Sequence, residues 1–310
     1  MKKTKDTNHE GKKPKKEKKK RTKKQLAFQI VAIIAIVFGG VAAGFYCGNL
    51  YLSTKIKTVD YSKLSEEDFL PKVDEVLSRN QGKSISEVSA IDAFVIAEHN
   101  LKNAPMFTST SHDSLTHNYG KQSVYTLKQF YNGVYLSKDI SCSSMKSIAK
   151  KIKVENGIAY VYNGEPTSET DATWSETYSE YTPEAYKEMV GLYPNAPISY
   201  IVSEQTLDPN DTAALQPGKT LANGNVQFTI TLNHTGSVMN YAKKIKYMSD
   251  LSDLPSFSSL VLNFEVDKNF NFVRITSSEV YSFKYAGGIF VTCSGSITTN
   301  YDFVTIPTEN

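Results

Sequence analysis

The histidines are the first residues to consider for metal chemistry. His112, Asp113 and His117 lie within six positions, and Glu98-His99 precedes them. A metal site needs several ligands that converge on one point. In a strand, His112 and His117 are an odd number of residues apart and point to opposite faces. The spacing argues against a shared metal unless a bulge intervenes, and we expect no metal and no cofactor.

An acidic, aromatic stretch offers residues suited to recognition. Residues 165–188 hold seven acids against one lysine. The interleaved aromatic residues are Trp174, Tyr178, Tyr181 and Tyr186. Such a surface suits a cationic ligand, a cell-wall component or a protein partner. The alternative is a solvated loop followed by an amphipathic helix on a sheet, which Thr182-Pro183 would begin and Gly191 would end.

Two cysteines fall on expected strands. Pairing of Cys142 with Cys293 would close a loop of roughly 150 residues, worth about 5 kcal/mol before strain. Buried free thiols in strands are the alternative, and both stay open. Cys47 lies at the outer edge of an expected membrane segment, where it is either acylated or packed.

Motifs of familiar enzyme classes are absent from the sequence. It has no serine-centred elbow, no phosphate-binding loop and no zinc-binding helix motif, and no spacing singles out a pair of carboxylates. An extracytoplasmic enzyme of unrecognised type is therefore the third functional hypothesis, behind two kinds of binding protein.

Charge is distributed unevenly along the 310 residues. Residues 1–24 hold 13 Lys/Arg against 3 Asp/Glu, a net charge of +10, whereas the remainder carries 22 against 29, a net charge of −7. Residues 26–47 contain no formal charge. At about 1.5 Å per residue they form about 33 Å of helix, enough to cross a bilayer.

The basic flank predicts the topology. Under the positive-inside rule the tail stays cytoplasmic, near anionic lipid headgroups, and the C-terminal domain lies outside a cell membrane that is crossed once. A lysine run without aromatic residues binds nucleic acid only nonspecifically. We expect an uncleaved anchor, and cleavage after the small residues 41–43 is the alternative.

Glycines recur every fourth residue along this segment, at Gly40, Gly44 and Gly48. The spacing lets two helices approach closely, as in a homodimer. Ordinary lipid-facing glycines are the alternative.

The outer segment changes from a helical period to a period of two near residue 105. Helices are expected over 69–77, 86–101 and 238–248. Strands are expected over 107–117, 124–131, 134–142, 148–155, 158–162, 226–232, 260–266, 273–285 and 289–303. Asn-Gly pairs at 132–133 and 156–157 predict hairpins. One apolar and one polar face per strand indicates an α+β domain with a large, twisted antiparallel sheet covered by a few helices.

The domain organisation follows from these patterns. The expected parts are a basic cytoplasmic tail (1–24), a transmembrane helix (25–48), a juxtamembrane stalk (49–64) and an extracytoplasmic α+β domain (65–310) with an irregular acidic insertion at about 164–222. Two smaller domains divided at that insertion are the alternative.

The order of elements over 86–303 resembles the lipoprotein-carrier fold of LolA and LppX-like proteins. The resemblance rests on a helix ending at 100–104 before a strand at 107–110, and on the late meander around 264–273. It implies a curved sheet whose concave side is plugged by helices and binds acyl chains. The insertion and the uncleaved anchor depart from the family, and no individual binding residue carries over.

These observations favour a noncatalytic binding domain for a lipid or another apolar ligand. The second hypothesis is a protein-interaction or envelope-assembly module that uses the acidic aromatic stretch. A cavity under the helices would separate the two, because a solid core cannot hold a lipid.

Overall fold

The computed structural model describes residues 63–144, 146–233, 235–285 and 289–304. The chain divides into two compact units, 1–51 and 52–310, and all described residues belong to the second. The basic tail, the expected membrane helix, its three glycines and nearly all of the stalk lie outside the described residues. Within the described ranges, no helix is long and apolar enough to cross a membrane.

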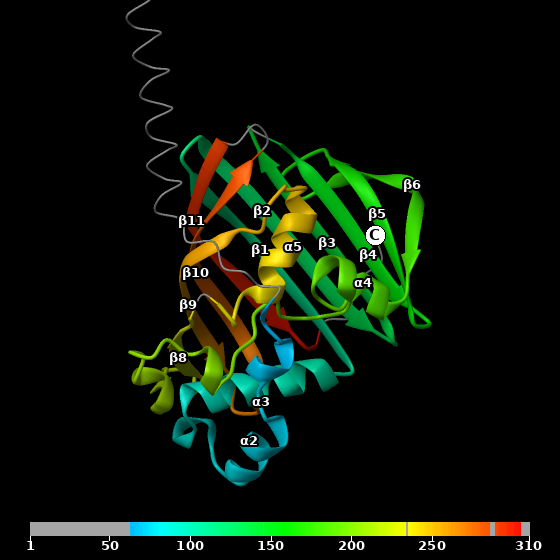
Figure 1. Ribbon diagram of the computed structural model, residues 1–310. Helices are drawn as coiled ribbons and strands as arrows, with labels where there is room; N and C mark the ends of the chain where they lie inside the picture. Colours follow the sequence, from blue (N-terminus) through cyan, green and yellow to red (C-terminus); the bar gives the residue numbers. More distant parts are fainter. Residues whose placement is uncertain (1–62, 145, 234, 286–288, 305–310) are drawn as a thin grey trace, which may run out of the picture. The chain divides into compact units, whose positions relative to one another are not determined.

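A single antiparallel sheet of eleven strands runs through the described part of the chain (Figure 1). Its strand order is β6-β5-β4-β3-β2-β1-β11-β10-β9-β8-β7, so that β1 and β11 lie side by side near the middle. The strands are β1 (Met106–His117), β2 (Gly120–Tyr131), β3 (Val134–Ser143), β4 (Ile148–Glu155), β5 (Ile158–Pro166), β6 (Ala172–Tyr181), β7 (Lys219–Thr220), β8 (Val226–Thr231), β9 (Ser256–Val266), β10 (Phe272–Tyr285) and β11 (Ile289–Asp302). The predicted large antiparallel sheet is confirmed.

Asparagine–glycine turns set the register of the hairpins β2–β3 and β4–β5. Asn132 and Gly133, between β2 and β3, have φ of 51° and 79°, and Asn156 and Gly157, between β4 and β5, have φ of 52° and 75°. Asparagine and glycine tolerate this left-handed backbone, which the tight turn requires at both positions. Both predicted hairpins are confirmed. The fixed register places alternate residues of β2 to β5 on one face of the sheet.

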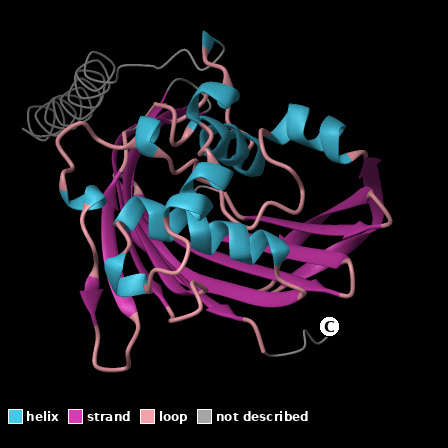
Figure 2. Ribbon diagram, turned by 90° about the horizontal axis from the view of Figure 1, so that it is seen from below, coloured by secondary structure: helices cyan, strands magenta, loops and turns pink. Residues whose placement is uncertain are grey.

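Helices cover the concave face of the curved sheet (Figure 2). They are α2 (Val73–Arg79), α3 (Ala90–Asn103), α4 (Pro183–Val190) and α5 (Met239–Ser249), with short 3-10 turns η2 (Glu66–Phe69), η3 (Ile85–Glu87), η4 (Glu204–Thr206) and η5 (Ala213–Leu215). The Ser89 side chain caps α3 by accepting a hydrogen bond from the backbone N–H of Asp92. This cap fixes where α3 starts, and α3 lies across one end of the sheet (Figure 1).

The main core lies between α3 and the strands β8 to β10. The Phe94 ring of α3 contacts the rings of Phe264 and Phe272 edge-on, with centroids 5.2 and 5.1 Å apart. Phe228 stacks on Phe264 at 5.1 Å. All four side chains are buried. Edge-on aromatic contacts of this kind add to the stabilisation from burial, so this end of the concave face is filled with side chains.

The insertion at residues 164–222 is more regular than the sequence suggested. Its first part forms the end of β5, the edge strand β6 and then α4. Thr182 caps α4 and Gly191 ends it with φ of 91°, as predicted. Irregular chain is concentrated between Gly191 and Gly218. β6 was missed because nearly all its side chains are exposed, which removes the alternation that identifies a strand.

Candidate functional site

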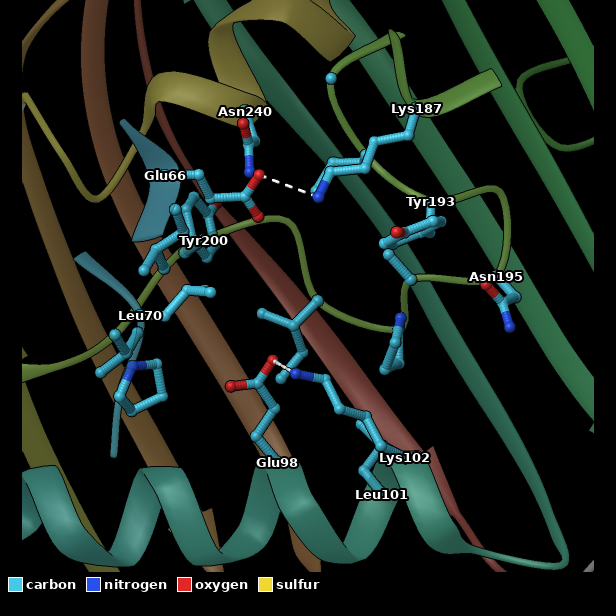
Figure 3. A pocket seen from close by; sticks show the side chains of 18 of the residues that line it. Glu66, Leu70, Glu98, Leu101, Lys102, Lys187, Tyr193, Asn195, Tyr200 and Asn240 are labelled. Atoms are coloured by element: carbon cyan, nitrogen blue, oxygen red, sulfur yellow. Dashed lines mark ion pairs between the residues drawn. The ribbon is translucent and has the colours of Figure 1, made fainter. Parts of the chain in front are cut away.

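A cavity of about 350 Å³ opens between α3, η2, the strands β1 to β3 and the irregular segment after α4 (Figure 3). Apolar side chains form much of its wall, namely Leu101, Phe107, Phe130, Ile198 and Val202. Its volume lies within the roughly 300–1,000 Å³ typical of small-molecule sites. We call this space the ligand cavity.

Charged side chains surround the same cavity in two ion pairs. Glu98 and Lys102 are one helical turn apart on α3, and their charged groups lie 2.7 Å apart. Lys187 of α4 reaches Glu66 at 3.0 Å (Figure 3). The Lys187 ammonium also lies 4.6 Å from the centre of the Tyr193 ring. The ligand cavity therefore combines an apolar wall with charged, hydrogen-bonding groups.

The segment 191–202 forms one side of the ligand cavity, and a buried lysine holds it to the sheet. Lys128 of β2 donates hydrogen bonds to the carbonyl oxygens of Ala196 at 3.1 Å and Pro197 at 2.7 Å. The backbone N–H of Ile201 donates to the Ser237 carbonyl at 2.9 Å. The segment is therefore held at two places, and we call it the strap.

Lys128 belongs to a charged group on the concave face. Asp139 of β3 lies 3.4 Å from the ammonium of Lys244 of α5 and accepts a hydrogen bond from Thr126 at 3.0 Å. Burial, with some repulsion from Lys244, lowers the pKa of Lys128 to about 7. Burial opposes ionisation of Asp139, but the ammonium groups of Lys244 and Lys128 outweigh it and hold the pKa of Asp139 below its ordinary value. The group therefore carries a net positive charge when Lys128 is protonated.

A second buried acid lies on β10. Glu279 is 1% exposed, and its carboxyl group accepts hydrogen bonds from Tyr241 at 3.1 Å and Tyr200 at 3.4 Å. Burial raises the pKa of Glu279 to about 7, although the two hydroxyl groups act in the opposite direction. Glu279 thus binds its proton much more tightly than an exposed glutamate does, and Tyr200 links it to the strap.

Sequence reasoning did not single out this arrangement. Ser277 and Glu279 were visible as polar residues at apolar positions of a strand pattern, which was the available signal. Lys128, Asp139 and Lys244 gave no signal, because β2, β3 and α5 bring them together only in the folded chain.

The four aromatic residues of the acidic stretch do not form one surface. Tyr178 is 49% exposed and packs beside Tyr160 at 5.4 Å. Trp174 lies on the same face of the sheet as Tyr178. The Lys151 ammonium is 5.3 Å from the centre of the Trp174 ring and 4.5 Å from that of Tyr162. Tyr162 in turn contacts Tyr178.

The other two aromatic residues face the helices. Tyr181 contacts Tyr186 of α4 with ring centroids 6.3 Å apart, and Tyr186 contacts Tyr247 of α5 at 6.4 Å. Tyr186 is 3% exposed. Tyr181 and Tyr186 therefore pack at the helices, which is the alternative that the sequence offered for this stretch.

Cys142 and Cys293 are free thiols, so of the two alternatives that the sequence left open the disulfide is not formed. Cys142 is on β3 and Cys293 is on β11, with β2 and β1 between them. Three strand spacings amount to about 14 Å, whereas a disulfide needs Cα atoms within about 7 Å. Cys293 is buried, as the alternative reading expected.

The histidines point to opposite faces of β1, as their spacing predicted. His112 is exposed and its ring nitrogen lies 3.3 Å from Glu169. His117 is buried and accepts a hydrogen bond from the Tyr119 backbone N–H. Among the described residues, no group of three or more His, Cys, Asp or Glu side chains could hold a metal ion.

Comparison with known proteins gives a limited result. No family model matches the chain, and no curated protein matches it. Solved structures similar to it include lipoprotein LppX from Mycobacterium tuberculosis, with a TM-score of 0.30, 9% identity and coverage of 71% of this chain and 97% of LppX. A DUF1329 family protein from Desulfovibrio piger has a TM-score of 0.27, 10% identity and coverage of 69% and 92%. The likeness to the LolA/LppX-like fold is a weak one. It identifies no specific relative.

Proposed function

We propose that this protein is a noncatalytic binding protein whose sheet-and-helix domain holds an amphipathic ligand in the ligand cavity. The observation that carries the proposal is a cavity of about 350 Å³ with apolar wall residues and charged groups around it. Apolar contact supplies the affinity for a hydrocarbon portion, and a few polar groups fix the orientation of the ligand. The resemblance stated for the sequence implies the same class of ligand.

The placement of the domain is part of the proposal. The uncharged segment 26–47 and the basic tail before it support a single membrane anchor with the N-terminus in the cytoplasm and the domain outside. Anionic headgroups would attract the tail, and Gly40, Gly44 and Gly48 would allow two anchors to pair. A tethered binding domain can receive or present a ligand close to the bilayer.

Mass spectrometry tests the function directly. Residues 52–310, a compact unit of their own, are purified without detergent, checked for folding by circular dichroism, and weighed under native and denaturing conditions. We expect one copurifying amphipathic molecule per chain. The Ala196→Trp variant places a large ring in the ligand cavity, and we expect that it removes this molecule.

A matched variant controls for the added ring. Ala213 is exposed, lies on η5 and does not line the ligand cavity, so Ala213→Trp should retain the ligand. An empty wild-type domain that also fails to bind added amphiphiles would contradict the proposal. Equal retention by both variants would show that the ligand lies elsewhere.

A second candidate function is a protein-interaction or envelope-assembly module. The supporting observation is the aromatic group on the edge strand β6 and its neighbour β5, where Tyr178 is 49% exposed beside Tyr160 and Tyr162. Trp174→Ala removes the largest ring of this side. Crosslinking in membranes should then lose a partner that the wild-type chain captures, and an unchanged set of partners would contradict this function.

A further inference from the structure

A smaller cavity of about 110 Å³ lies on the other side of the strap, between α5 and the middle of the concave face. Most of its lining residues carry a hydroxyl or an ammonium group. Lys128 and Lys244 contribute ammonium groups, and β1, β10, β11 and the strap contribute hydroxyl groups. We call it the polar chamber. Because a water molecule takes up about 30 Å³ in the liquid, it has room for about four waters, which fits a small polar group but not a long chain.

Several hydrogen-bond donors line the polar chamber. Lys128 is 8% exposed and has three N–H donors, of which two bind the strap carbonyls. Ser109 and Ser111 of β1 are 2% and 4% exposed and line the chamber, and their hydroxyl groups are not among the fully buried, unpartnered side-chain atoms of the described residues, which are those of Thr108 and Ser123. Buried polar groups are nearly always hydrogen-bonded. A guest that accepts hydrogen bonds can therefore use the third donor of Lys128 and the two serine hydroxyl groups.

The charges around the chamber select the sign of that guest. Two lysines line it, and its lining residues, all described, include no carboxylate. The nearby acids lie behind residues of the lining: Asp139 pairs with Lys244 and Thr126, and Glu279 accepts hydrogen bonds from Tyr200 and Tyr241. When Lys128 is protonated, two lysines against Asp139 leave a single positive charge, which a monoanion balances. A cation would meet two ammonium groups at close range.

The ligand cavity and the polar chamber share the wall residues Pro197, Ile198 and Tyr200. The ligand cavity and the polar chamber therefore adjoin at these residues of the strap. We infer that the polar chamber binds the ionised carboxylate of an acidic amphiphile whose hydrocarbon chain occupies the ligand cavity. The inference deepens the proposed function, because it assigns the ligand a chemical class and an orientation.

Carbon-13 NMR with carboxyl-labelled dodecanoate tests the inference. The full-length chain is placed in phosphatidylcholine nanodiscs, and empty nanodiscs supply the signal of dodecanoate dissolved in the bilayer. We expect one additional carboxyl resonance per chain, and it should remain ionised at a pH where the bilayer pool is protonated. Nearby ammonium groups and hydroxyl donors stabilise the carboxylate form.

Serine variants distinguish dodecanoate bound in the polar chamber from dodecanoate dissolved in the bilayer, and they leave the charges of the chamber unchanged. The double variant Ser109→Ala, Ser111→Ala should weaken dodecanoate binding at least about tenfold, because hydrogen bonds to a charged group are the stronger class. Ser123→Ala is the control. Ser123 is a buried serine on β2 that lies outside the chamber, and its replacement should leave binding unchanged.

Each remaining outcome decides the question. Dodecanol that binds as tightly as dodecanoate, with no effect of the serine double variant, overturns the carboxylate site and leaves the proposed function intact. Acetate that displaces the labelled carboxylate at the same concentration as dodecanoate overturns the role of the chain and assigns the chamber to free small carboxylates. Absence of any resonance beyond the bilayer signal overturns the inference, and copurification with residues 52–310 then decides the proposed function separately.

Discussion

Replacement of Glu279 by glutamine should stabilise the domain at neutral pH. In the folded chain the pKa of Glu279 is raised from 4.5 to about 7 by burial. The folded state therefore keeps a proton that the unfolded state loses, and stability falls as pH rises from about 4.5 to about 7. The difference of about 2.5 in pKa, at 1.36 kcal/mol each, makes this loss on the order of 3 kcal/mol. Glutamine has no charge to bury and keeps the size of the side chain.

The assay is the free energy of unfolding by urea, followed by circular dichroism from pH 4.5 to pH 8 for residues 52–310. Wild type and Glu279→Gln should be nearly equal at pH 4.5, and the variant should exceed wild type by on the order of 3 kcal/mol at pH 8. Equal stability of the two proteins at pH 8 would refute the reasoning, because it would mean that water or a cation reaches the carboxylate.

Glu265 on β9 provides a control of the opposite sign. It is 7% exposed, and its hydrogen bonds from Asn225 and Asn223, with the charge of Arg274, hold its pKa below the ordinary value despite burial. Its stabilisation is present at neutral pH and is lost as pH falls through the lowered pKa. Glu265→Gln should therefore destabilise the domain at pH 8, and the difference should shrink on acidification.

Three further predictions concern the strap, a helix end and the thiols. Above pH 7 the free energy of unfolding of the wild type should rise toward pH 10, because the unfolded chain keeps a proton on Lys128 that the folded chain releases. Asp139 and Lys244 are the charged groups that face Lys128. Urea unfolding of Lys128→Met should not show this rise. Gly191→Ala should lower the free energy of unfolding by about 1–3 kcal/mol, since φ is 91° and the added Cβ meets Lys243 at 2.6 Å. A thiol reagent followed by mass spectrometry should label Cys142 in the folded domain and Cys293 only after unfolding, because burial raises the pKa of Cys293 to about 11.

The sheet was largely predictable because each of its inner strands carries a local signal. Alternation along β9 to β11 and the glycine turns at Gly133 and Gly157 act within a few residues, and these short-range constraints determine strand identity and register. β6 had no such signal, since an edge strand exposed on both faces does not alternate. The pairing of β1 with β11 joins segments about 190 residues apart, which no local pattern encodes.

The candidate site was much less predictable. Lys128, Asp139 and Lys244 each look like ordinary surface residues in the sequence, because single polar positions are common in strands and helices. Their burial follows from the strap and α5 covering the sheet, which is a tertiary property. Ser277 and Glu279 did interrupt an apolar face, and such interruptions are the sequence features to examine first when an inner face is expected to hold a ligand.

A polar stripe across the concave face also decides between kinds of ligand. In register, Ser109 lies opposite Lys128 and Lys128 opposite Ser137, while Ser111 lies opposite Thr126. A wholly apolar molecule covering this stripe would leave buried donors unpaired, at a cost of about 1–3 kcal/mol for each group. A carboxylate placed there accepts from the same donors and balances the lysines, so its presence turns that cost into affinity. The geometry of the inner face therefore favours an acidic amphiphile over a neutral lipid, with the hydrocarbon portion directed toward Leu101 and Phe107, away from the lysines.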